Sequence, residues 1–172
     1  MNQQDSNYAI WLRPSQSELD KLTGLISSLS HQFRTIPFPM HITLLSGFSS
    51  KLKTIIEACK KVSETHTRFT INLRSIEYTE KYYMNLFILA EKNERLLDLH
   101  STLSDKLKPD HNEEFIPHVS LLYGNHDEPK QQELKLLLAD RYPKTIHCER
   151  IDVYNCIGNE SQWYLEESFY LK

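Results

Sequence analysis

Two short segments of this 172-residue chain each pair an imidazole with a hydroxyl: His41 with Thr43, and His118 with Ser120. Histidine titrates near pH 6.5, so two histidines can supply one base and one acid near neutral pH. Two hydroxyls suit hydrogen bonding to the oxygens of a phosphoryl group. The four residues include no carboxylate and no thiolate, so they do not form an obvious metal-binding site. If they converge on one pocket, they predict cleavage of a phosphodiester without metal or cofactor.

The two segments are copies of one repeat. Residues 38–47 read FPMHITLLSG and residues 115–124 read FIPHVSLLYG, with Phe, His, both Leu and Gly at matching positions. Two of the four glycines in the chain occupy the matched last position. A repeat inside otherwise dissimilar halves indicates two copies of one structural unit.

Each copy is predicted to be a β-strand, because Val, Ile, Thr and Leu dominate a short apolar run. Side chains alternate between the two faces of a strand. His41 and Thr43 should therefore point to one side, and Ile42 and Leu44 to the other. The second copy repeats this arrangement, and the glycine after each strand is expected to begin a turn.

The other elements must position these strands. Apolar periodicity predicts the order strand, helix, strand, helix, strand, strand, helix, strand, helix, strand, strand. Besides the two repeat segments, strands are expected at residues 8–12, 69–76, 82–90, 145–156 and 163–171. Helices are expected from a Ser15–Glu18 capping box to about residue 31, from a Ser49 or Ser50 cap through Val62, over about 91–107, and from an Asp127 cap to near residue 142.

This order predicts one α+β domain spanning residues 1–172, since no Gly-rich linker divides the chain. We expect two pseudo-symmetric lobes, each a mostly antiparallel sheet with its helices outside. If a pseudo-twofold axis relates the lobes, the two repeat strands face each other across a central cleft. Residues 109–114 are expected to form a polar connector.

The composition is that of an ordinary globular protein, with 40% apolar and 25% charged residues. A net charge of −3 argues against a grip on long nucleic acid through many phosphates. No apolar run approaches the roughly 20 residues that span a bilayer, and the polar first seven residues show no secretory pattern. Three cysteines without a recognisable spacing do not suggest a disulfide framework, and Cys59 falls on a helical apolar face. A cytoplasmic monomer is the default expectation.

The segments HIT at 41–43 and HVS at 118–120 resemble the paired His-x-Thr/Ser motifs of the 2H phosphoesterase superfamily. Within it, the chain looks most like the plant and fungal cyclic phosphodiesterases. The run PHVSLLYG at 117–124 is similar to the second motif of that group, and IWLRP at 10–14 and YYMNLF at 82–87 also fit. The resemblance covers most of the chain, although only the two motifs are specific.

The resemblance implies a bilobal fold, no metal, and hydrolysis of a small cyclic phosphate. ADP-ribose 1″,2″-cyclic phosphate and nucleoside 2′,3′-cyclic phosphates are the implied substrates, opened to a phosphomonoester that is typically the 2′-phosphate. We assign His118 as the base that activates water and His41 as the acid that protonates the leaving ribose oxygen. Thr43 and Ser120 are expected to hold the non-bridging oxygens. The disulfides of some plant members have no evident counterpart in this chain.

Three aromatic residues are further candidates for substrate binding. Tyr123, at the end of the second motif, could donate a hydrogen bond to the phosphate or stack on a base. Trp163 and Tyr83 could stack on adenine, since ring stacking recognises the face of any base. The other six histidines are expected to be surface or core residues with structural roles.

Two alternative functions stay open at this point. Another 2H enzyme, such as an RNA 2′,5′ ligase/phosphodiesterase or a 3′-end RNA-trimming enzyme, would need a groove for several nucleotides and a basic stripe. The acidic pI of about 6.2 disfavours that option. The non-enzymatic alternative is a module that binds phosphate-terminated nucleotides without turnover.

Overall fold

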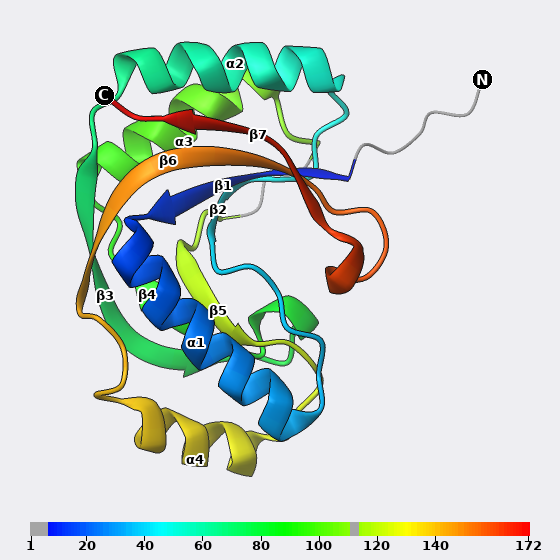
Figure 1. Ribbon diagram of the computed structural model, residues 1–172, viewed down its shortest axis with the longest axis vertical. Coiled ribbons are helices and arrows are strands. Elements are labelled where there is room, and N and C mark those ends of the chain that lie inside the picture. Colours follow the sequence, from blue (N-terminus) through cyan, green and yellow to red (C-terminus); the bar gives the residue numbers. More distant parts are fainter. Residues whose placement is uncertain (1–6, 111–113) are drawn as a thin grey trace.

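The computed structural model of the chain describes residues 7–110 and 114–172, and its elements follow the predicted order (Figure 1). The strands are β1 (Tyr8–Pro14), β2 (Ile42–Leu45), β3 (Phe69–Tyr78), β4 (Leu86–Ala90), β5 (His118–Leu122), β6 (Thr145–Asn155) and β7 (Tyr164–Tyr170). The helices are α1 (Gln16–Phe33), α2 (Leu52–Thr65), α3 (Glu94–Leu107) and α4 (Glu128–Leu138), with short 3-10 turns η1 (Tyr82–Met84) and η2 (Glu160–Gln162). The predicted α+β class is confirmed.

The described strands form one bent, antiparallel, seven-stranded sheet in the order β2-β1-β6-β3-β4-β5, with β7 paired to β6. Strand β6 changes partner along one edge, from β3 at residues 145–148 to β7 at residues 150–155. Strand β3 then passes from β6 to β4 and joins the two halves of the sheet. The two repeat strands, β2 and β5, stand at opposite ends of this order and yet are in contact, because the sheet curls until its ends meet.

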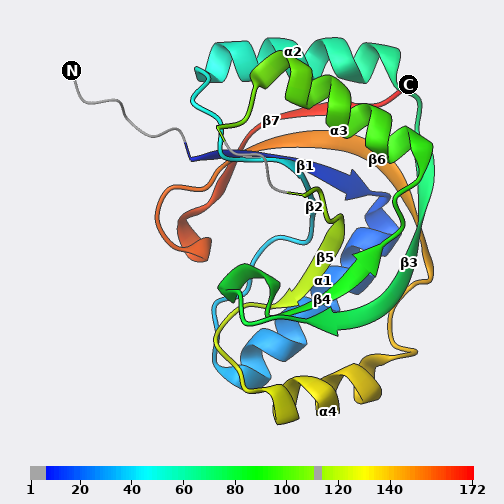
Figure 2. The ribbon, with the colours of Figure 1, turned by 180° about the vertical axis from the view of Figure 1, so that it is seen from behind.

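The helices cover the outer faces of the sheet, and two of them cross between its halves (Figures 1 and 2). Helices α2 and α3 pack together over β2, β6 and β7, whereas α1 packs on β5 and α4 on β3. Helix α1 thus leaves β1 to cover the repeat strand of the other half, and α3 leaves β4 to cover β2. This exchange ties the two predicted lobes into a single packed core.

The two repeat strands share an irregularity as well as a sequence. Along β1 and β2 the pairing passes from Leu45 to Thr43 and skips Leu44, and along β4 and β5 it passes from Leu122 to Ser120 in the same way. A β-bulge of this kind bends a strand and redirects its side chains. The predicted repeat is therefore a repeat of backbone geometry.

The predicted alternation of side chains along the repeat strands is confirmed. The side chains of Ile42, Leu44, Val119 and Leu121 are buried in the core. The motif histidines and hydroxyls alternate with them and face away from that core, toward the hollow between β2 and β5.

The predicted cap of α2 is wrong, whereas Ser15 is the N-cap residue of α1 as predicted but lacks the hydrogen bonds of a capping box. The Ser15 hydroxyl donates to Glu18 Oε2 (2.6 Å) and makes no cap hydrogen bond, and the Glu18 carboxylate accepts from the backbone N–H of His147 (2.9 Å). Neither Ser49 nor Ser50 caps α2. The Ser49 hydroxyl donates to the carboxylate of Asp110, which lies beyond α3, and the Ser50 hydroxyl donates to the carbonyl of Leu107, the last residue of α3. At α2, long-range partners therefore replace the local cap.

Other boundaries follow from local hydrogen bonds. The predicted Asp127 cap of α4 is confirmed, with the carboxylate accepting from the backbone of Lys130 (3.4 Å). Helix α3 begins at Glu94, later than expected, because Asn93 caps it. Helix α4 ends at Leu138 and not near residue 142. Residues 82–84 form η1 and not the start of a strand, since the Thr79 hydroxyl donates to the carbonyl of Met84 (2.7 Å).

Three further expectations concern the chain as a whole. Cys59 is buried as predicted, and the three cysteines are free. Part of the predicted connector at 109–114, and the first six residues, in which no secretory pattern was found, lie outside the described residues. Within the described ranges, no helix combines the length and the apolar character needed to cross a membrane.

Candidate active site

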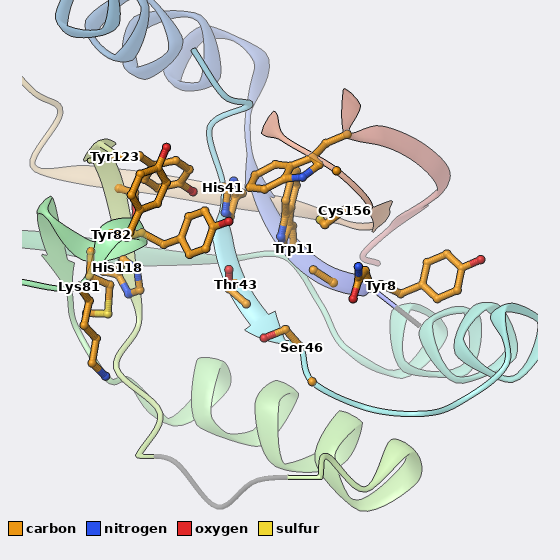
Figure 3. A pocket seen from close by; sticks show the side chains of 18 residues that line it. Tyr8, Trp11, His41, Thr43, Ser46, Lys81, Tyr82, His118, Tyr123 and Cys156 are labelled. Atoms are coloured by element: carbon orange, nitrogen blue, oxygen red, sulfur yellow. The ribbon is translucent and has the colours of Figure 1, made fainter. Parts of the chain in front are cut away.

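A cavity of about 650 Å³ lies where β2 and β5 meet (Figure 3). This volume is typical of pockets for small molecules. Every site residue predicted from the sequence lines it: His41, Thr43, Tyr83, His118, Ser120, Tyr123 and Trp163. In Figure 3, His41, which directly precedes β2, and Thr43 on β2 face His118 on β5 across the cavity. The predicted convergence of the two motifs is thus present in the structure.

Both imidazoles are anchored in the same way. His41 Nδ1 lies 2.6 Å from the carbonyl oxygen of Pro39, and His118 Nδ1 lies 2.7 Å from that of Ile116. Because a carbonyl oxygen only accepts, Nδ1 of each neutral ring must carry the hydrogen and donate it. Nε2 of each ring is then the nitrogen left to accept or deliver a proton.

The surroundings of the two rings differ. His41 is only 8% exposed and stacks on Trp11, with centroids 3.8 Å apart and planes 6° apart. His118 is half-buried and meets Phe87 edge-on, at 5.2 Å and 65°. Trp11 and Phe87 are matched positions, since each pairs with the hydroxyl residue of its neighbouring motif strand. The repeat therefore supplies each histidine with an aromatic support, but only one of them is stacked.

Burial lowers the pKa of both histidines below the ordinary value. For His41, burial is the main cause and the positive charge of Arg13 acts in the same direction, so that its pKa falls to about 3. For His118, burial lowers the pKa, partly opposed by the hydrogen bond to Ile116. Near neutral pH both rings are neutral in the unliganded protein, and His41 is held neutral more firmly.

The two motif hydroxyls also differ. The Thr43 hydroxyl lines the cavity and makes no hydrogen bond to any residue that the structure describes. The Ser120 hydroxyl is 2.8 Å from the carbonyl oxygen of Tyr83 and donates to it.

Aromatic side chains form one wall of the cavity. Tyr83 is 53% exposed and meets Tyr123 edge-on, with centroids 5.0 Å apart. Trp163 is half-buried and meets Trp11 edge-on at 6.0 Å. Its indole nitrogen is buried and has no hydrogen-bond partner among the described residues. Tyr83 therefore offers the more open ring for stacking on a base.

Tyr123 reaches the cavity although strand alternation would place it on the opposite face from Ser120. It follows the last residue of β5, so the alternation no longer applies to it. It is only 3% exposed and stacks on Phe38 at 3.6 Å. Because Phe38 covers one ring face, hydrogen bonding through the hydroxyl suits Tyr123 better than stacking on a base.

Several lining residues were not identified from the sequence. Trp11 could have been found by pairing residues 8–14 with the first repeat strand, because it lies directly opposite Thr43. Tyr82 and Lys81 flank the predicted Tyr83. Cys156 directly follows β6, and no local sequence pattern marks it as a site residue. Burial raises its pKa to about 12, so it is a protonated thiol.

The cavity contains little charge. Lys81 is the only Lys, Arg, Asp or Glu among the lining residues within the described part of the chain. No group of three or more His, Cys, Asp and Glu side chains in residues 7–110 and 114–172 is placed to hold a metal ion. The histidines at 31, 66, 100, 126 and 147 lie outside the cavity, and the one at 111 is outside the described residues.

Proteins of known sequence or structure are similar to this chain over nearly its whole length. A protein of Oceanobacillus iheyensis that is named as a phosphoesterase, without a stated substrate, is 22% identical over 168 residues, which are 95% of this chain and 97% of that protein. TT0787 of Thermus thermophilus has a TM-score of 0.68 at 17% identity, with 96% of this chain and 97% of that one covered.

Two further solved structures share the fold at low identity. LigT of E. coli in its apo form has a TM-score of 0.65 at 11% identity, with 97% and 98% of the two chains covered. Usb1 of Kluyveromyces marxianus has a TM-score of 0.50 at 14% identity, with 94% and 97% covered. At these identities the structures show a common fold.

The family model described as the 2′-5′ RNA ligase superfamily matches residues 13–160, a range that includes both histidine motifs and all four helices of the described chain. With this match and the fold shared with LigT and Usb1, the chain belongs to the 2H phosphoesterase (2′-5′ RNA ligase) superfamily.

Proposed function

We propose that this protein is a cyclic phosphodiesterase that opens a ribose cyclic phosphate to a phosphomonoester without a metal ion. The substrate is ADP-ribose 1″,2″-cyclic phosphate, a nucleoside 2′,3′-cyclic phosphate, or both. The observation that carries the proposal is the pair of imidazoles, each with Nδ1 bound to the carbonyl two residues earlier, on two strands that face one cavity. Two neutral rings with free Nε2 atoms are suited to acid–base chemistry on one phosphorus.

In the proposed reaction, water attacks phosphorus in line with the ribose oxygen that leaves. One histidine takes a proton from the water through Nε2 as the new P–O bond forms. The other, protonated at Nε2, donates to the ribose oxygen as the old P–O bond breaks. Each well-placed proton transfer contributes roughly 10²–10⁴-fold. The product is a phosphomonoester, and the two histidines exchange protons with solvent before the next turnover.

The environments of the two rings favour an order of roles opposite to that assigned from the sequence. His41 is the more deeply buried ring and stays unprotonated near neutral pH, as the base must at the start of the reaction. His118 is half-buried, and burial is the one cause that lowers its pKa. A bound phosphate anion favours protonation of nearby imidazoles. We therefore propose His41 as base and His118 as acid.

The rest of the cavity suits a small anionic nucleotide. The unpaired hydroxyl of Thr43 can donate to a non-bridging oxygen, and Lys81 supplies one positive charge. The exposed ring of Tyr83 provides a surface for a base. Structures of E. coli LigT, which shares this fold, have been determined with phosphate and with 3′-AMP, and this supports a phosphate-bearing nucleotide as the ligand class.

The family description names RNA ligation, so an RNA 2′,5′ ligase/phosphodiesterase is the second candidate. Such an enzyme needs contacts to several phosphates. Only one Lys or Arg of the described chain lines the cavity, and the net charge is −3. These observations favour the small cyclic substrate.

The test compares three substrates in the presence of a chelator: ADP-ribose 1″,2″-cyclic phosphate, 2′,3′-cyclic AMP and a short 2′,5′-linked oligoadenylate. We expect phosphomonoester from one or both cyclic compounds. His41→Ala and His118→Ala should each reduce turnover by at least about 10²-fold with an unchanged circular dichroism spectrum. His31→Ala, on the exposed surface of α1 and outside the cavity, is the matched control.

The outcomes separate the candidates. Near-normal turnover in either motif variant would reject the two-histidine mechanism. Cleavage of the oligoadenylate alone would favour the RNA enzyme, and nucleotide binding without product would favour a binding module. Loss of all activity on adding chelator would overturn the metal-free proposal.

A further inference from the structure

The two strands that carry the site are not hydrogen-bonded to each other. Strand β2 pairs with β1, and β5 pairs with β4, so each motif strand is a terminal strand of the sheet. In the described ranges no backbone hydrogen bond joins β2 to β5. Two proton transfers on one phosphorus, however, require His41 and His118 at a fixed separation. Contacts other than the hydrogen bonds of the sheet must therefore set that separation.

The phenylalanine that begins each repeat is placed to do this. Phe38 directly precedes Pro39, and Phe115 directly precedes Ile116. The carbonyls of Pro39 and Ile116 are the two groups that anchor Nδ1 of the motif histidines. A contact that holds either phenylalanine therefore also holds the anchor of an imidazole.

Each of these phenylalanines lies flat against a ring that is connected to the other repeat. Phe38 stacks on Tyr123, the residue directly after β5, with centroids 3.6 Å apart and planes 10° apart. Phe115 stacks on His100 of α3, at 3.8 Å and 4°. His100 Nδ1 in turn donates to the carbonyl oxygen of Leu44 on β2 (2.7 Å). The anchor of each motif histidine is thus tied to the opposite motif strand.

The bulge in β2 explains why Leu44 can accept this hydrogen bond. The pairing of β1 and β2 skips Leu44, and a bulged residue has no partner in the ladder, so its carbonyl is available to α3. The chain just beyond α3 is also fastened to the turn after β2. The Asp110 backbone N–H donates to the Gly47 carbonyl (2.8 Å), and the Asp110 carboxylate accepts from the Ser49 hydroxyl (2.6 Å). His100 is therefore held firmly to β2, and its ring extends this support to the other repeat.

We infer that His100 is a positioning residue for the reaction: by linking Leu44 on β2 to Phe115 before β5, it fixes the two imidazoles relative to each other. His100 lies outside the cavity, so it is not placed to touch the substrate. The inference rests on the proposed function and deepens it, because it names a residue on which the chemical step depends. Removing the link should slow turnover and leave binding of the nucleotide nearly unchanged.

The two ends of the link can be cut separately by substitution. His100→Phe keeps a ring against Phe115 but cannot donate to Leu44, whereas His100→Asn keeps an N–H donor but has no ring. Because a link cut at one end no longer connects the strands, each variant should lower kcat on 2′,3′-cyclic AMP about 10–10²-fold. His100→Ala, which cuts both ends, should lose no more than the larger of these two losses. KM, and the Kd of the phosphomonoester 2′-AMP by titration calorimetry, should change less than about threefold.

Two control variants separate this effect from a loss of stability. Ser101→Ala changes the next residue of α3, on its exposed side, and should leave kcat unchanged. Val62→Ala shortens a buried side chain of α2, away from both motif strands and from α3, and should lower the free energy of unfolding. The kcat of folded Val62→Ala should nevertheless stay near that of wild type. A His100 variant that is as stable as Val62→Ala should therefore still be the slower enzyme.

A measurement that needs no turnover tests the same link. The NMR signals of the His41 and His118 rings, assigned from the two motif alanine variants, should move in His100→Phe and His100→Asn, although the ring of His100 stacks on Phe115 and not on either of them. The same signals should keep their positions in Ser101→Ala.

Three results would overturn the inference: motif ring signals that stay in place in both His100 variants, a kcat near that of wild type in either variant, or a KM and a Kd that rise as much as kcat falls. The proposed function fails separately, if the wild-type protein hydrolyses none of the cyclic phosphates. In that case the ring signals still decide whether His100 holds the two strands.

Discussion

The imidazole of His41 lies flat on the indole of Trp11, with ring centroids 3.8 Å apart and planes inclined by 6°. The hydrogen bond from Nδ1 to Pro39 fixes the rotation of the same ring in its own plane. Trp11 is itself stacked on Tyr154, at 3.9 Å. His41 is thus held both in tilt and in rotation before any ligand arrives, as a base for in-line attack requires.

Replacement of Trp11 should therefore impair the chemical step more than binding. Trp11→Leu keeps an apolar side chain but removes the flat support, and we expect kcat on 2′,3′-cyclic AMP to fall about 10–10²-fold with a smaller change in KM. Trp11→Phe, which keeps a ring face, should retain most of the activity. Steady-state kinetics and urea unfolding of both variants provide the check. An unchanged kcat in Trp11→Leu would show that the stacking does not orient His41.

Burial of a neutral His41 should make the protein sensitive to acid. An unfolded histidine takes up a proton below about pH 6.5, whereas His41 in the folded protein, with its pKa lowered by burial, does so only near pH 3. Between these values the unfolded state binds more protons. The contribution of neutral His41 to the free energy of unfolding is therefore fully present above pH 6.5 and is lost as the pH falls toward 3.

Urea unfolding of wild type and His41→Gln between pH 7 and pH 4 measures this contribution. Wild type should lose roughly 3 kcal/mol more than the variant over that range, since each pH unit corresponds to about 1.36 kcal/mol for one proton. Parallel pH dependences of the two proteins would mean that His41 is protonated in the folded state as readily as in the unfolded one.

The sequence was sufficient for the polar part of the site because strand alternation is a local property. His41, directly before β2, and Thr43 both face the cavity, and Ile42 and Leu44 are buried behind them. This arrangement needs no knowledge of neighbouring strands. The order of helices and strands was predictable for the same reason, since each depends on the spacing of apolar residues within a few turns.

The parts that were missed depend on long-range pairing. The place of Trp11 beside His41 follows from the register of β1 on β2 and from a β-bulge, and no local sequence pattern predicts that bulge. The hydrogen bonds of the predicted capping box at Ser15 are absent because Glu18 instead accepts from the backbone N–H of His147, which is far away in the sequence. The crossing of α1 onto β5 is likewise a property of the assembled core.

Arg13 should tune the pKa of His41 from behind the site. Its guanidinium is buried, lies 3.6 Å from the Asp152 carboxylate, and leaves two of its nitrogens without a hydrogen bond to any described group. Asp152 also accepts from Arg150 (3.2 Å) and from the Ser168 hydroxyl (2.6 Å), so it keeps partners if Arg13 is replaced. The Arg13 charge adds to burial, the main cause, in lowering the pKa of His41.

Arg13→Met should raise the pKa of His41, since one of the causes that lower it is removed. With His41 as base, the acidic limb of the kcat/KM profile should move to higher pH. Titration of the His41 ring by NMR gives the shift directly, and Arg13→Lys, which keeps a positive charge, is the control. An acidic limb that stays in place in Arg13→Met would argue that Arg13 serves only to balance Asp152.

Two glycines provide a last, matched comparison of stability and activity. Gly24 lies on the exposed side of α1, and a Cβ added there meets no atom within 4 Å. Gly24→Ala should raise the free energy of unfolding by about 0.5–1 kcal/mol, because alanine loses less backbone entropy in a helix, and it should not change turnover.

Gly124 ends the second repeat with φ +139°, and a Cβ there would lie 2.8 Å from His126 Nε2. Its backbone N–H also holds the Tyr82 carbonyl. Gly124→Ala should therefore lower the free energy of unfolding by about 1–3 kcal/mol through strain and should weaken 2′-AMP binding, because the turn beneath Tyr83 moves. Thermal unfolding and calorimetry of the two variants test both effects. If Gly124→Ala were as stable and as active as Gly24→Ala, the hydrogen bond at Tyr82 would have no part in shaping the cavity wall.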